Sequence, residues 1–203
     1  MKTLLKIVWS LSLVLLAACG SRSHQSDFRQ ALSHEEKVGE QFAKLILENG
    51  HGDGEILVLI HPEGGRRVRE IEARRIRGLK RGLGRSASNL REVAAGSPED
   101  PAVMMLMNDF LPVDLLKSAM ETAQNPSALI SLLGYPYLEP AMENLPPIYV
   151  FGVNRQDLAR EAIHSGWAEA ALYSKGSDDM PVAVASSRLP PELLQSYGLA
   201  VRP

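Results

Sequence analysis

Short runs made entirely of apolar residues alternate along this chain with segments in which apolar residues recur every three or four positions. The clearest run, residues 56–60, is aliphatic at every position, which is typical of a parallel strand buried on both faces. A segment with helical spacing precedes it and ends at Asn49 and Gly50, and another follows over residues 66–83. Because parallel neighbours need long crossover connections, this alternation favours an α/β sheet covered by helices.

The same pattern continues almost to the end of the chain. Further strands are predicted at 89–94, 128–133, 148–153 and 168–173, with 182–186 as a last edge strand, and further helices over 112–125 and 154–165. No internal repeat interrupts them, so we expect one doubly wound domain over residues 34–203, with a mainly parallel sheet of five to six strands. Ser33 and Glu36 have capping-box spacing and predict the start of the first helix.

The glycines of the helix over residues 66–83 constrain its packing. Gly78 and Gly82 lie one turn apart, although glycine lowers helix propensity. They predict a close approach of this helix to its sheet.

The beginning of the chain has the layout of a secretory leader. Lys2 and Lys6 flank the start of an apolar run over residues 7–16, which is too short to span a bilayer comfortably. The run ends in Leu16-Ala17-Ala18-Cys19, a tetrad that resembles a bacterial lipobox, in which the Cys is lipidated and becomes the first mature residue.

We therefore expect a signal peptide over residues 1–18 and a flexible tether over 19–33 that starts at lipidated, palmitate-bearing Cys19. Gly20 follows the Cys where other lipoproteins carry Asp, which predicts the outer membrane, facing the periplasm, in a cell that has one. A plain signal peptide with an incidental Cys is the alternative.

Composition excludes several classes of protein. A single Cys among 203 residues excludes a disulfide scaffold and a Cys-rich zinc site, and a formal net charge of −2 excludes a protein that coats nucleic acid uniformly. The charge is uneven, because residues 66–91 contain ten Arg or Lys and two Glu. This segment is either a solvated face balanced by the acidic remainder or a surface for anionic lipid or an acidic partner. Nucleic acid is not expected, since no aromatic residue interleaves the run for base stacking.

Several segments occur in an order that matches a known family. They are a Gly-led strand at 52–60 after a helix, an Arg-x-x-Gly motif at 75–78, and the segments 128–136, 147–154 and 162–172. Together, over roughly residues 35–190, they resemble the second lobe of type 1 periplasmic sugar-binding proteins of ABC transporters. The resemblance implies one lobe of a two-lobed protein that closes on a sugar. A cleft would then need a homodimer or a separate first-lobe protein.

Candidate ligand-binding residues lie where the predicted strands end, because ligands of open parallel sheets bind beyond the carboxyl ends of the strands. His61 follows the strand at 56–60, Tyr135 follows the strand at 128–133, and Asn154 follows the strand at 148–153. The resemblance implies that Arg75 and Asn154 contact the sugar. Each has a structural alternative: Asn154 as a helix N-cap, Arg75 as a solvated position, Tyr135 as a packing residue and His61 as a structural residue at a strand end.

Two residues depart from the family pattern. The family often carries an amide or an acid where this chain has Pro136, and a Gln near the position of Ser174. Two of its usual polar contacts are therefore replaced, which leaves two functions open. The first is a lipid-anchored envelope module that binds a carbohydrate for uptake or sensing. The second is an interaction or scaffolding lipoprotein that keeps the fold without the pocket. An enzyme is not expected: His61 and Glu63 could act as an acid–base pair, but no further His or carboxylate lies nearby to complete a triad or a metal site, and no cofactor is implied.

Overall fold

The computed structural model describes residues 31–62, 65–95, 110–123, 125–136, 144–153, 156–174, 189–191, 193 and 197–202. Several predicted features lie outside these residues: the leader with Cys19, most of the tether, Glu63, Asn154 and the edge strand predicted at 182–186. No helix in the described part is both long and apolar enough to cross a membrane.

Six strands form one sheet, in the order β2 (Leu90–Ala94), β1 (Ile56–Ile60), β4 (Ala128–Ser131), β6 (Ile148–Val153), β7 (Ala170–Ser174) and β8 (Tyr197–Val201). All neighbouring pairs are parallel except β7 and β8. The chain leaves β1 toward β2 on one side and returns to β4 on the other, which is the doubly wound arrangement. The predicted fold class is therefore confirmed.

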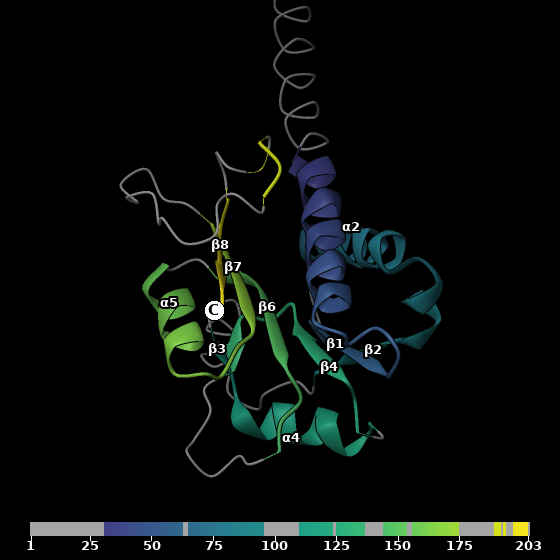
Figure 1. Ribbon diagram of the computed structural model, residues 1–203, viewed down its shortest axis with the longest axis vertical. Helices are drawn as coiled ribbons and strands as arrows, with labels where there is room; N and C mark the ends of the chain where they lie inside the picture. Colours follow the sequence, from purple (N-terminus) through teal and green to yellow (C-terminus); the bar gives the residue numbers. More distant parts are fainter. Residues whose placement is uncertain are drawn as a thin grey trace, which may run out of the picture.

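Helices cover both faces of the sheet (Figure 1). On the first face, the helix over residues 31–48 lies beside α2 (Arg66–Leu83), and both contribute to one hydrophobic cluster. On the second face, α4 (Val113–Glu121) and α5 (Gln156–His164) contribute to the other cluster. A 3-10 turn, η1 (Gly84–Asn89), joins α2 to β2, and two short strands, β3 (Phe110–Leu111) and β5 (Tyr135–Pro136), pair separately.

Strand β1 shows why the apolar runs become central strands. Val58 packs in the first cluster and Leu57 in the second, and neither is exposed. Side chains alternate between the faces of a strand, so a strand covered on both sides must be apolar at every position. Full burial of each such side chain contributes roughly 1.5–3 kcal/mol.

The predicted start of the first helix is wrong. Residues 31–48 are helical throughout, so Ser33 is not the N-cap. Glu36 does not act in a capping box, because its carboxylate forms ion pairs with Arg74 and Arg81 of α2. Leu32 is buried, and the burial of this apolar side chain stabilises a helix that begins before Ser33.

The predicted contact of the α2 glycines with the sheet is also wrong. A Cβ on Gly78 would overlap the backbone oxygen of Glu36, and one on Gly82 would lie 2.5 Å from the Cβ of Ala43. In return, a Cβ on Gly39 would overlap the backbone oxygen of Arg75. The glycines therefore bring α2 close to the helix over 31–48, with helix backbones almost in contact.

Strand β8 was not predicted. It runs antiparallel to β7 at the edge of the sheet, with Ser174 opposite Tyr197. Gly198 faces the ring of Tyr173 so closely that a Cβ there would overlap the ring. The strand is thus shaped by the residue opposite it on β7, which a reading of local pattern does not reveal.

Candidate functional site

The carboxyl edge, where the five parallel strands end, is the natural place for a ligand in this topology. The chain reverses its winding direction between β1 and β4, and loops beyond such a switch point diverge to leave a crevice. His61 directly follows β1 at this edge. Since β8 is antiparallel, its first residue, Tyr197, lies at the same edge beside Ser174.

The backbone at His61 is held by a buried carboxylate. The N–H of His61 donates a 2.8 Å hydrogen bond to Oε1 of Glu72 on α2. Glu72 is 6% exposed, and its burial raises the pKa of its carboxyl above the usual range. The end of β1 is therefore tied to α2, and the imidazole of His61, which is half-buried, is carried by a fixed backbone.

Arg75 lies in a buried ion pair. Its Nε is 2.6 Å from Oε2 of Glu35, and the two side chains are 11% and 10% exposed. The hydroxyl of Tyr197 donates a 2.5 Å hydrogen bond to the other carboxylate oxygen of Glu35. The guanidinium carbon of Arg75 lies 6.0 Å from the centre of the Phe151 ring. Three elements that are distant in sequence, the helix over 31–48, α2 and β8, thus meet at Glu35.

The Tyr197 hydroxyl at this contact is shielded from solvent. Burial raises the pKa of its phenol well above the usual value, and the adjacent carboxylate of Glu35 raises it further. The phenol is therefore protonated at neutral pH, where its hydroxyl donates to Glu35.

Tyr135 lies away from the carboxyl edge. After β4, the hydroxyl of Ser131 donates a 2.6 Å hydrogen bond to the carbonyl of Gly134, whose φ is 88°, and the chain turns toward the second face. Tyr135 is 3% exposed there and stacks on Trp167, with ring centres 5.8 Å apart. Burial raises the pKa of Tyr135 to about 12. These surroundings match the packing alternative.

Asn154 lies outside the described residues, but its neighbours at the ends of β6 and β7 do not. Gln156, the first residue of α5, donates a 3.3 Å hydrogen bond to the hydroxyl of Tyr173 near the end of β7. The polar side chains at this edge therefore include those of His61, Ser174 and Gln156, and Arg75 lies on α2, which covers the first face.

Sequence reasoning missed four residues of this edge: Glu35, Glu72, Gln156 and Tyr197. Glu72 had a detectable signal, since it precedes Ile76 and Leu79 by one and two helical turns and so falls on the buried side of α2. Glu35 and Tyr197 had none, because they are separated by 162 positions.

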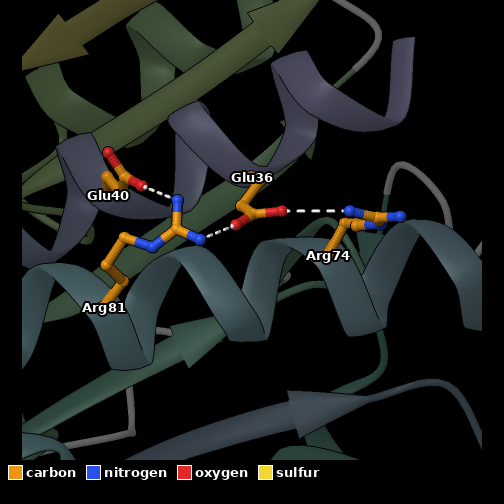
Figure 2. A network of polar contacts seen from close by, with 4 residues as sticks. All are labelled: Glu36, Glu40, Arg74 and Arg81. Carbon is orange, nitrogen blue, oxygen red and sulfur yellow. Dashed lines mark hydrogen bonds and ion pairs between the residues drawn. The ribbon is translucent and has the colours of Figure 1, made fainter. Parts of the chain in front are cut away.

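Three of the ten cations of residues 66–91, Arg74, Arg75 and Arg81, pair with carboxylates of the helix over 31–48. Glu36 lies between Arg74 and Arg81, at 3.1 and 2.5 Å, and Arg81 also reaches Glu40 at 2.8 Å (Figure 2). Elsewhere in the segment, Lys80 pairs with Glu92 and Arg91 with Glu55. On the side of α2 that faces the helix over 31–48, the positive charges are therefore balanced by acidic residues, as one of the two alternatives for this segment predicted.

The outward side of α2 differs. Arg66, Arg69 and Arg77 are exposed, and none of them forms an ion pair with a residue that the structure describes. Within the same residues, no three His, Cys, Asp or Glu side chains are grouped so that they could hold a metal ion.

No family model matches this chain, and no curated protein matches it. Among solved structures, it is similar to an ABC transporter solute-binding protein from Burkholderia graminis C4D1M in complex with D-arabinose, with 15% identity over 68% of this chain and 47% of that one and a TM-score of 0.45. It is similar to a sugar-binding protein of a sugar ABC transporter from Bacillus halodurans, with 15% identity over 68% and 45% and a TM-score of 0.45. It is also similar to XylFII in its complex with LytSN, with 16% identity over 68% of this chain and 53% of that one and a TM-score of 0.41. The chain thus spans about half the length of these proteins.

Proposed function

We propose that this chain is a lipid-anchored binding module of the cell envelope, and that a neutral, sugar-like ligand binds at its carboxyl edge. The observation that carries the proposal is the switch point between β1 and β4, with His61 held at the end of β1 by Glu72. Neutral hydrogen-bonding groups such as Ser174 and Gln156 suit hydroxyl groups better than they suit a charged ligand. A second copy or a separate lobe would complete the cleft.

Arg75 has a defined part in this proposal. Its ion pair with Glu35 uses Nε, and no described residue accepts a hydrogen bond from its terminal nitrogens. A guanidinium held in this way keeps donors for sugar hydroxyls while its charge is balanced. Asn154, after β6, would add an amide at the same edge.

The ligand is tested by calorimetric titration of the purified chain with a panel of sugars. We expect a neutral sugar whose affinity falls at least tenfold in both Asn154→Ala and His61→Ala. Lys117→Ala, an exposed change on α4, is the matched control and leaves the affinity unchanged. Arg75→Lys keeps a cation beside Glu35 but removes the terminal guanidinium nitrogens. A loss of affinity in this variant would therefore show that these nitrogens donate to the sugar. Absence of any bound sugar, or equal affinities in all variants, contradicts the proposal.

The proposed lipid anchor is inferred from the tetrad that ends at Cys19. A thioether-linked diacylglycerol together with an N-acyl chain gives the stable attachment that one acyl chain does not. In cells supplied with labelled palmitate, we expect label in the wild-type chain and none in Cys19→Ser, with the variant released from the membrane fraction. Equal labelling of both chains would exclude Cys19 as the attachment point.

A second function, an interaction lipoprotein with no pocket, is favoured by the outward arginines Arg66, Arg69 and Arg77. They are the cations of α2 that an acidic partner could reach without disturbing the helix pair. Reversing all three to Glu is expected to release a partner that co-purifies with the chain. Reversing Lys44, Lys117 and Arg160, which are also exposed, is the control with the same charge change. Unchanged co-purification in the first variant eliminates this function.

A further inference from the structure

A hollow of about 660 Å³ lies at the amino edge of the sheet, opposite the carboxyl edge. It is lined by the loop that leads into β1, the end of η1, the start of β2 and Thr122, the residue that caps the carboxyl end of α4. Its polar lining residues are Asp53, Glu55, Ser88, Asn89, Arg91 and Thr122. Neither proposed function uses any of them.

The walls of this hollow are cross-linked by hydrogen bonds. The Asn89 side chain donates a 3.0 Å hydrogen bond to the carbonyl of Gly52. The hydroxyl of Ser127 reaches the carbonyl of His51 at 2.8 Å and that of Glu55 at 3.1 Å. A Cβ on Gly54 would lie 2.7 Å from the side chain of Ser127, so the loop backbone is in close contact with its support. A hollow held in this way is formed before any ligand arrives, which reduces the entropic cost of binding.

The charges of the hollow favour a cation. Arg91 is already held there, with Nε 2.6 Å from Oε1 of Glu55 and a terminal nitrogen 2.5 Å from the carbonyl oxygen of Thr122. That carbonyl belongs to the carboxyl end of α4, where the helix dipole is negative. With Arg91 balanced by Glu55, the exposed carboxylate of Asp53 remains, and no described residue forms an ion pair or hydrogen bond with it.

We propose that the amino-edge hollow is a binding site for a small hydroxylated primary amine, such as an amino sugar. The ammonium group pairs with Asp53, in the way that Arg91 already pairs with Glu55. Hydroxyl groups of the ligand exchange hydrogen bonds with Ser88, Asn89 and Thr122. The site is independent of the carboxyl edge, since it involves the opposite ends of β1 and β2.

The probe is glucosamine at pH 6, where its amine is protonated, compared with N-acetylglucosamine, which has the same ring but no charge. Binding to the full chain is followed by nuclear magnetic resonance, through the amide signals of Asp53, Gly54 and Ser88. We expect glucosamine to bind about two- to fivefold more tightly than N-acetylglucosamine, the gain of one solvent-accessible ion pair. Added salt reduces the difference, because such a pair is screened.

Asp53→Asn removes the charge and keeps the shape, so it is expected to make the two affinities equal. Asp114→Asn, the same change at an exposed position on α4, and His61→Ala, at the carboxyl edge, are expected to retain the difference. Equal affinities of the wild-type chain for the two probes, or an unchanged preference in Asp53→Asn, would overturn the proposal. Failure of the carboxyl-edge function is separate, because it is measured by the effects of His61→Ala and Asn154→Ala on neutral sugars.

Discussion

Arg75 and Glu35 form an ion pair across two helices, with Nε and Oε2 2.6 Å apart and both side chains about nine-tenths buried. Transfer of two charges out of water is costly, and their mutual attraction offsets that cost only when the contact is close and the remaining polar atoms are bonded. The Tyr197 hydroxyl meets the second requirement for Glu35. The pair thus fixes the helix over 31–48 to α2 and to β8.

Removing one partner of this pair is expected to destabilise the fold more than removing both. Arg75→Met leaves the Glu35 carboxylate buried without its cation, at a cost of about 3–5 kcal/mol in the free energy of unfolding. In Arg75→Met/Glu35→Gln no buried charge remains, so much of the loss is recovered. Urea denaturation of the two single variants and the double variant measures the coupling. Strictly additive effects would show that the two side chains do not interact in solution.

Gly78→Ala tests the contact between helix backbones. Alanine favours a helix by about 1 kcal/mol over glycine, but here its Cβ would overlap the backbone oxygen of Glu36. The helices must separate, so we expect a net loss of roughly 1–3 kcal/mol in unfolding free energy. Ala73→Ser, on the exposed side of α2, is the control and changes stability by less than about 0.5 kcal/mol. A Gly78→Ala protein more stable than the wild type would contradict the observed packing.

Glu36 serves two arginines at once, as Figure 2 shows. Glu36→Gln is therefore expected to lower the thermal midpoint more than Arg74→Gln does. Arg74→Gln removes only one of the two ion pairs, and Glu36, which is 11% exposed, keeps its ion pair with Arg81. High salt narrows the difference between wild type and Glu36→Gln. A larger effect from Arg74→Gln would show that the shared carboxylate is not central.

Two buried tyrosines predict loss of stability at alkaline pH. Burial raises the pKa of both Tyr135 and Tyr149 to about 12 in the folded chain, from an ordinary value of 10.0. A raised folded-state pKa means that the unfolded chain loses its proton first. Their contribution is therefore complete below pH 10 and is lost as the pH rises toward about 12.

Chemical denaturation at half-unit steps between pH 9 and 12 measures this loss. Tyr135→Phe is the simpler variant, because among the described residues its buried hydroxyl has only a weak contact with Ser165 and no hydrogen bond of ordinary geometry. It is expected to make the decline with pH shallower, by up to about 1.4 kcal/mol per pH unit within that window. Tyr149→Phe also removes a 2.9 Å hydrogen bond from Asn49, so it lowers stability at neutral pH as well. An unchanged slope in Tyr135→Phe would show that Tyr135 is not buried in solution.

The predictability of the site differed from residue to residue. His61 was predicted at the end of β1 because a strand and the residue after it are adjacent in sequence. Arg75 was singled out from its motif, but its partner was not, since Glu35 lies 40 positions earlier on another helix. The position of Tyr135 on the second face depends on the turn at Gly134, whose φ of 88° is not written in the apolar pattern before it.

The sequence by itself determined the α/β class, because strands covered on both faces must be apolar at every position and helices must show their own period. Tertiary structure alone decided what the polar and small residues do. It set Gly78 against another helix, paired Glu36 with both Arg74 and Arg81, and joined β8 to β7. The physical reason is range: periodicity is a property of neighbouring residues, whereas an ion pair or a backbone contact requires two distant segments to be brought together.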